Sequence, residues 1–182
     1  SEDSGDPYYS SNGYGKSQSW SRSFWYGQEA TGNYDTGAHN WGYLHSPLIT
    51  LAGTGTNELR FWSWEQVEPF TGFDTRSIYI SNNGGASWQW LWDSEDNTSN
   101  WHQVSIDLSY YAGQNVILSF FFNTWSELDN NYSGWYVDDI EIVSEDPPPI
   151  PTQSPTGLIA LLVIMGLLLI VATINMRAKP RL

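Results

Sequence analysis

Short segments in which apolar and polar side chains alternate recur along the first 143 residues, and they limit the folds open to this chain more than any other feature. Aromatic residues are frequent in them, since the sequence contains 11 Trp, 11 Tyr and 7 Phe. The alternating or apolar segments are 19–26, 42–51, 59–65, 77–81, 87–92, 101–108, 115–123 and 134–143. A period of two residues is typical of β-strands. We therefore predict an all-β fold, a sandwich in which two antiparallel sheets bury each other's apolar faces.

Four of these segments carry further information about strand order. Segments 77–81 and 87–92 flank the sequence NNGGA, whose Asn and Gly residues suit a tight turn, so the two segments predict a hairpin. Segment 115–123 is apolar almost throughout and predicts a central strand. Pro47 cannot donate a ladder hydrogen bond, which predicts an edge or a bulge within 42–51.

Residues 157–174 contain no charged side chain, and Thr173 is their only polar one. At about 1.5 Å per residue this segment reaches roughly 27 Å, close to the hydrocarbon thickness of a bilayer. We predict a single C-terminal transmembrane helix over 157–175, with a buried core helix as the alternative. Arg177, Lys179 and Arg181 follow it, which by the positive-inside rule places the C-terminus in the cytoplasm and the preceding domain outside the cell membrane.

Composition divides the chain into five predicted parts. They are a flexible N-terminal segment (1–18), the β-sandwich (19–143), a Pro-rich stalk (144–156), the transmembrane helix (157–175) and a basic cytoplasmic tail (176–182). A stalk of this composition extends by up to ~3.1 Å per residue. Because an exported domain needs a leader, we expect that one was removed or that it precedes the first residue given.

The charge distribution restricts the classes of partner and of chemistry. The formal net charge is −13, and all 20 Asp and Glu lie in residues 1–146, so phosphate backbones would be repelled and we expect no nucleic-acid binding. Cysteine is absent, which excludes disulfides and thiol chemistry. His39, His45 and His102 are isolated in the sequence and none has a Glu next to it. No nucleophile–base arrangement is visible, and we expect no enzymatic activity.

Five segments, in order, resemble the jelly-roll domain of the MAM-like superfamily, and within it the module found at the C-terminal end of immune inhibitor A-type metalloproteases. They are 33–51, 59–68, 78–91, 101–124 and 134–142, the last reading GWYVDDIEI. The tail 150–179 is similar to prokaryotic C-terminal sorting signals, from which it departs at Gln153. The resemblance implies a non-catalytic jelly roll with a structural cation site, which mediates adhesion or contacts with carbohydrate or protein at the cell surface.

Two adjacent carboxylates, Asp138 and Asp139, stand at the centre of the last predicted strand, where one of them must face inward. A buried carboxylate needs hydrogen-bond donors, a cation or a proton. Asp138 therefore either accepts hydrogen bonds from backbone amides and a tyrosine, or binds a metal ion. The resemblance implies a cation between the loop 27–35 and this aspartate. On that basis we expect Ca2+, or sodium, at Glu29, Asp35 and Asp138, with Glu65 as a possible fourth ligand.

Two further sets of residues are candidates for contacts at the surface. Trp88, Trp90 and Trp92 lie at alternate positions of one predicted strand, so they share a face. That face is either a stacking platform for sugar rings or for a protein surface, or part of the core. Asn97 and Asn131 begin N-x-S/T sequons and are possible glycosylation sites.

Two functions remain open from the sequence. The first is a membrane-anchored, extracytoplasmic binding or adhesion module with a structural cation site. The second is an accessory structural subunit docked on the outer, periplasmic or extracellular side of a larger membrane protein complex.

Overall fold

The computed structural model describes residues 2–3, 18, 23–70 and 72–145. Within these residues the regular elements are strands and one 3-10 turn. They are β1 (Glu2–Asp3), β2 (Ser23–Tyr26), β3 (Trp41–His45), β4 (Ile49–Thr50), β5 (Thr56–Gln66), β6 (Thr75–Ser81), β7 (Gln89–Ser94), β8 (His102–Asp107), η1 (Ser109–Tyr111), β9 (Asn115–Asn123) and β10 (Gly134–Glu145).

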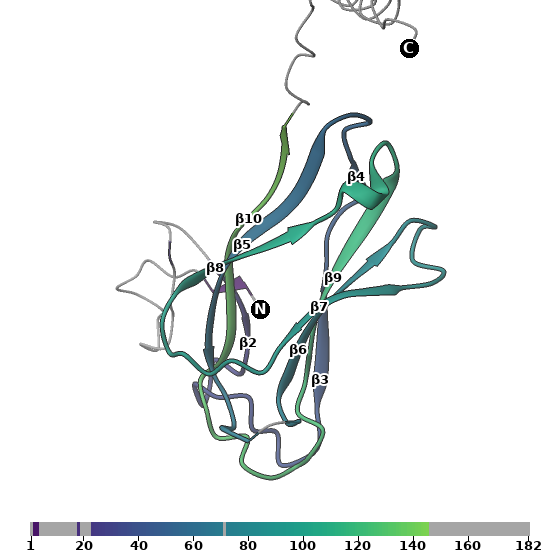
Figure 1. The fold of residues 1–182 in the computed structure, drawn as a ribbon. Coiled ribbons are helices and arrows are strands. Elements are labelled where there is room, and N and C mark those ends of the chain that lie inside the picture. The colour runs from purple at the N-terminus through teal and green to yellow at the C-terminus, as the bar shows by residue number, and fades with distance from the viewer. Residues whose placement is uncertain (1, 4–17, 19–22, 71, 146–182) are drawn as a thin grey trace, which may run out of the picture. The chain divides into compact units, whose positions relative to one another are not determined.

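The strands form two antiparallel sheets that face each other, as Figure 1 shows. One sheet has the order β1-β2-β10-β5-β8, and the other has the order β3-β9-β6-β7 with β4 paired to β9. Apart from the β1–β2 and β6–β7 pairs, neighbouring strands of each sheet are not consecutive in the sequence, which is the jelly-roll-like arrangement. The predicted all-β sandwich of two antiparallel sheets is confirmed.

The core lies between the two sheets and is built by the inward-facing residues of each. Leu59 and Phe61 on β5 are fully buried, and Phe61 meets Phe120 of β9 edge to face with ring centroids 5.3 Å apart. Burying an aliphatic or aromatic side chain of this size contributes about 1.5–3 kcal/mol. Alternation along β9 directs Leu118 and Phe120 inward, while Ser119 and Phe121 face the other side of the sheet.

Strand β9 is central, as predicted, because β3 pairs with it on one side and β6 on the other. The predicted strand 42–51, which pairs with β9, is divided into β3 and β4, and Pro47 lies between them. The missing N–H of proline accounts for this break. The hairpin predicted around NNGGA is confirmed, since β6 pairs with β7.

Strand β10 contains a β-bulge at the two adjacent carboxylates Asp138 and Asp139. Its register against β5 shifts between Asp138 and Glu141, and Asp139 adopts a positive φ of 47°. Asp139 is exposed there. At the start of the strand, Gly134 has φ 88°, and a Cβ at this position would lie 2.3 Å from the carbonyl oxygen of Tyr26. Only glycine fits such a position.

The predicted stalk, transmembrane helix and basic tail lie outside the described residues, apart from residues 144–145, which continue β10. Among the residues that are described, no helix has the length and apolar character needed to cross a bilayer. Two residues of the segment expected to be flexible, Glu2–Asp3, form β1 against β2.

Candidate functional site

The outward face of the β3–β9–β6–β7 sheet carries a groove walled by aromatic rings. Register places Tyr43 beside Phe121 and His45 beside Ser119, and the other neighbour of Ser119 is Tyr79. Opposed residues of an antiparallel pair project from the same face, so these side chains meet although they come from three strands. The aromatic groove, as we call it, is lined by Tyr43, His45, Tyr79, Trp88, Ser119 and Phe121 and has a volume of about 340 Å3.

Several of these rings are nearly parallel. Tyr43 stacks on Phe121 with centroids 4.4 Å apart and planes 19° apart. His45 stacks on Trp88, which precedes β7, at 5.1 Å and 17°, and it lies 5.6 Å from Tyr43 at 18°. Tyr43 is 57% exposed and Trp88 37% exposed. Flat apolar surfaces of this kind are therefore presented to solvent.

One polar atom at the groove has no partner. Ser119 is 1% exposed, and its Oγ has no hydrogen-bond partner in the described part of the chain. A buried hydroxyl without a partner costs about 1–3 kcal/mol, so it is uncommon unless it serves a function. None of the six lining residues is an acid, a lysine or an arginine. The groove thus combines flat apolar walls with a buried hydroxyl that has no partner in the described part of the chain.

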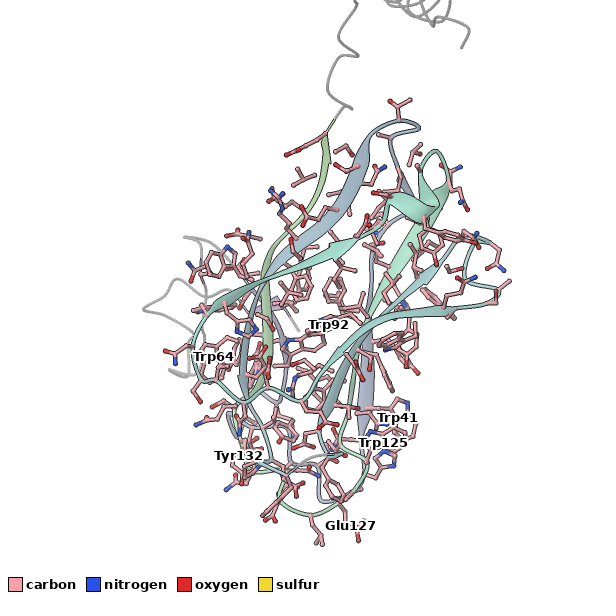
Figure 2. All side chains as sticks on the ribbon, viewed as in Figure 1. Trp41, Trp64, Trp92, Trp125, Glu127 and Tyr132 are labelled. Carbon is pink, nitrogen blue, oxygen red and sulfur yellow. The ribbon has the colours of Figure 1, made fainter. Side chains whose placement is uncertain are left out.

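The prediction that Trp88, Trp90 and Trp92 share one face is wrong for Trp92. Trp92 packs against the core and meets Phe61 edge to face with centroids 6.0 Å apart, between the sheets in Figure 2. The physical reason is an irregularity in the β6–β7 pairing: Tyr79 is opposite Trp90, but Ile78 is opposite Trp92, which leaves Leu91 as an extra residue. Trp90 stays outside and is 59% exposed.

Sequence reasoning missed five groove residues, namely Tyr43, His45, Tyr79, Ser119 and Phe121. The alternation of Tyr43 and His45 in β3 was a usable signal, since both project from one face. What the sequence could not supply was the neighbour of each residue across the ladder.

Asp138 is 4% exposed and is held by backbone amides. Its Oδ1 accepts a hydrogen bond from the N–H of Asp139 and its Oδ2 accepts one from the N–H of Gln18, both at 2.8 Å. Backbone amides therefore donate hydrogen bonds to Asp138, as one of the two alternatives for this residue expects.

The four predicted metal ligands are not brought together. Asp138 is opposite Trp62 in the ladder, whereas Glu65 is opposite Trp135, so Asp138 and Glu65 project from opposite faces of the same sheet. Glu29 and Asp35 are exposed, and Asp35 Oδ1 accepts a hydrogen bond from the N–H of Gly37 at 2.8 Å. Within the described ranges, no three His, Asp or Glu residues are grouped so that they could hold a metal ion. Calcium binding stays a prediction.

Glu65 lies in a buried polar cluster that has some of the parts of a hydrolytic site but not their arrangement. Glu65 accepts a hydrogen bond from Ser63 Oγ, and its Oε1 lies 3.6 Å from His102 Nε2. Ser63 is fully buried, donates to Glu65 and accepts from Trp135 Nε1 at 2.9 Å. A serine nucleophile needs to be accessible and to donate to its base, here a histidine. Ser63 instead fixes Glu65 between the sheets.

The two predicted glycosylation sites are in exposed loops. Asn97 hydrogen-bonds both the N–H and the C=O of Val67, at 3.0 and 2.8 Å. Asn131 Oδ1 accepts a hydrogen bond from Asn33 Nδ2 at 2.5 Å. Their glycosylation stays a prediction.

The fold and the groove together define a β-sandwich domain of jelly-roll-like type. The sequence matches no model of a known protein family. It is 34% identical over 115 residues to bacillopeptidase F of Bacillus subtilis, a match that covers 63% of this chain and 8% of that protein's length.

Solved structures with related folds include carbohydrate-binding and adhesin domains. The TmCBM61 module in complex with β-1,4-galactotriose gives a TM-score of 0.46 at 15% identity, covering 79% of this chain and 81% of the other. The K3 cleaved adhesin domain of Lys-gingipain from Porphyromonas gingivalis gives 0.44 at 18% identity, covering 68% and 73%. Values this low do not transfer a function to this chain.

Proposed function

We propose that the chain is a non-catalytic binding module that takes neutral carbohydrate in the aromatic groove. The observation that carries the proposal is the combination of near-parallel rings with the partnerless hydroxyl of Ser119. A pyranose ring has flat C–H faces that stack on aromatic rings and hydroxyl groups at its rim that exchange hydrogen bonds. Because no acid or ammonium group lines the groove, a neutral saccharide fits it better than a charged one.

Binding of the full chain to a panel of soluble neutral polysaccharides tests this proposal. We would use galactan, xylan, β-glucan and mannan, with the protein in mild detergent, and measure affinity by calorimetry. Tyr43→Ala and Trp88→Ala each remove one wall of the groove and should weaken binding about tenfold or more, the equivalent of about 1.4 kcal/mol.

A matched control is available outside the groove. Tyr110 in η1 is 83% exposed and contacts Tyr111, so Tyr110→Ala also removes an exposed aromatic ring. It should leave affinity unchanged. Absence of binding to every polysaccharide, or equal losses for Tyr110→Ala and Tyr43→Ala, would refute the proposed function.

The setting of the module is part of the same proposal. We place it outside the cell, as a member of the MAM-like group, anchored in the cell membrane by residues 157–175, with its C-terminus in the cytoplasm. The support is the apolar segment and the three bases that follow it. Protease treatment of intact cells should remove the sandwich and leave a small membrane-bound fragment; protection of the sandwich would contradict this orientation.

An accessory subunit of a larger membrane complex is the second candidate. The observation that favours it is a set of exposed apolar side chains in the β5–β6 and β9–β10 loops, none of which lines the groove. Phe70 is 63%, Trp125 57% and Leu128 67% exposed. Purification in mild detergent followed by mass spectrometry separates the two functions, because a subunit brings a stoichiometric membrane partner and a carbohydrate-binding module does not.

A further inference from the structure

The outward face that carries the aromatic groove continues beyond the groove, toward the start of β3 and the end of β9. Trp41 lies two residues before Tyr43 on β3, and its partner on β9 is Asn123, two residues after Phe121. Alternate residues of a strand project from one face, and opposed residues of an antiparallel pair share that face, so Trp41 and Asn123 lie on the groove side of the sheet. From His45 to Trp41 this face extends about 13 Å along the strand.

Trp125, in the loop after β9, brings a second indole ring to this end of the face. Its Nε1 donates to Thr75 Oγ1 at 2.9 Å, and Thr75 is the partner of Asn123 on β6. The ring therefore lies on the β6 side of Asn123, whereas Trp41 lies on the β3 side. Figure 2 shows Trp41 and Trp125 near the same end of the sandwich.

Both indole rings are exposed although the segments that carry them are held in place. Trp41 is 56% exposed and Trp125 is 57% exposed. Asn123 Oδ1 is hydrogen-bonded to His39 Nε2 at 2.6 Å and accepts a second hydrogen bond from the N–H of Trp125 at 3.1 Å. The ring of His39 contacts that of Trp41, with centroids 5.0 Å apart. One asparagine thus connects the supports of both rings, and neither ring is buried in the core.

The backbone of Trp125 is strained. Its φ is 56°, in the left-handed region, which a bulky side chain rarely adopts. Strain of this kind persists where the surrounding structure enforces it, and it is concentrated at functional sites. The hydrogen bonds to Asn123 and Thr75 hold the residue in this conformation. Burial of the ring does not offset the strain, because more than half of the side chain remains exposed.

The charges near this face favour a neutral ligand. Asp93 of β7 is opposite Ser77 and is exposed, so a carboxylate borders the face on its β7 side. The described residues contain two arginines and no lysine: Arg76 is fully buried, and Arg60 belongs to the other sheet. An acidic polysaccharide would therefore meet a carboxylate on this face and neither lysine nor arginine.

We propose that the aromatic groove is one part of a longer platform that reaches Trp41 and Trp125 and takes several consecutive sugar units of a linear neutral polysaccharide. This inference rests on the proposed function and adds the length and direction of the ligand. The polysaccharide chain lies along the strands, with one unit on the stacked rings of the groove and a further unit at the two indoles. A single sugar makes only part of these stacking contacts, so affinity increases with the length of the ligand.

A comparison of short and long ligands tests the platform with the full chain in mild detergent. We would measure affinity by calorimetry for cello-, xylo-, manno- and galacto-oligosaccharides, in each series for the disaccharide and the hexasaccharide. In the series that binds, the hexasaccharide should bind about tenfold more tightly or better. Trp41→Ala and Trp125→Ala should each lower the affinity for the hexasaccharide about three- to tenfold and leave that for the disaccharide unchanged. Tyr43→Ala should instead lower the affinity for both.

Two further variants separate a lost stacking contact from a disturbed loop. Tyr110→Ala removes an exposed ring outside the platform and should leave both affinities unchanged. Trp125→Phe keeps an aromatic ring but cannot donate to Thr75, so it should bind the hexasaccharide more tightly than Trp125→Ala does.

Three results would overturn the platform while the proposed function stands. They are equal affinities of the wild type for the two lengths, wild-type affinity for the hexasaccharide in both Trp41→Ala and Trp125→Ala, and equal losses in Trp125→Phe and Trp125→Ala. Absence of binding to every oligosaccharide and every polysaccharide would instead remove the proposed function, and this inference with it.

Discussion

Replacing Ser119 by alanine should change stability and ligand affinity in opposite directions. In most buried positions a serine hydroxyl has a partner, so its removal weakens the fold. The Oγ of Ser119 is buried and has no partner in the described part of the chain. Its removal therefore takes away a desolvation cost and breaks no hydrogen bond.

The expected gain in stability follows from that cost. A buried hydroxyl without a hydrogen bond costs about 1–3 kcal/mol in mutational data, and the single atom lost from the packing offsets part of the gain. We expect Ser119→Ala to raise the free energy of unfolding by about 1 kcal/mol, which for a domain of this size raises the melting temperature by about 3–5 °C.

The expected loss in affinity comes from the same hydroxyl. If Ser119 Oγ exchanges a hydrogen bond with a saccharide hydroxyl, its loss removes about 0.5–1.5 kcal/mol, or a two- to twelvefold decrease in affinity. Thermal denaturation gives the first quantity, and calorimetry with the polysaccharide found in the binding panel gives the second.

Ser63→Ala is the matched comparison, since Ser63 is also buried in a sheet but donates to Glu65 and accepts from Trp135. It should lower stability by about 1–3 kcal/mol and leave affinity unchanged. A loss of stability in Ser119→Ala equal to that in Ser63→Ala would show that the Ser119 hydroxyl has a partner in the free protein. The Ser119 hydroxyl would then not be available to a saccharide, contrary to the proposed role of this residue in the groove.

Four further substitutions test the packing and the backbone contacts. Trp92→Ala should lower the free energy of unfolding by about 3–5 kcal/mol because the ring packs on the core, whereas Trp90→Ala should lower it by under about 0.5 kcal/mol. Equal losses in chemical denaturation would contradict the register shift. Asn57→Ala removes both hydrogen bonds to the backbone of Ala52, at 2.9 and 3.0 Å, and should cost about 2–4 kcal/mol; a Tm within 2 °C of wild type would argue against this. Gly134→Ala should cost at least about 1–3 kcal/mol because of its positive φ and the carbonyl contact, and unchanged unfolding would disprove the strain.

The strand segments could be predicted because their signal is local. Segment 59–65 lies within β5, segment 101–108 contains β8, and the apolar run 115–123 coincides with the central strand β9. A side chain's face within a strand depends only on the period of two, so these features need no knowledge of the rest of the chain.

The face that carries the aromatic groove could not be predicted in the same way, because it depends on register. Trp92 was expected on the same face of the strand as Trp90, but one extra residue in β7 directs the Trp92 side chain toward the core. A shift of one residue moves every later side chain of a strand to the other face. Likewise the stacking of Tyr43 on Phe121 joins residues from β3 and β9, which only the ladder brings together.

The buried carboxylates show the same division. The sequence indicated that Asp138 needs partners, and the fold decided that backbone amides supply them. The hydrogen bond from the N–H of Glu68 to Asp74 Oδ2 was not visible, because it depends on how the β5–β6 loop folds. Sequence alone determined the β-strands, the acidic charge and the aromatic content, because these are local properties. Tertiary structure decided which rings and which oxygens become neighbours, because strand register and loop packing are set by the whole sandwich at once.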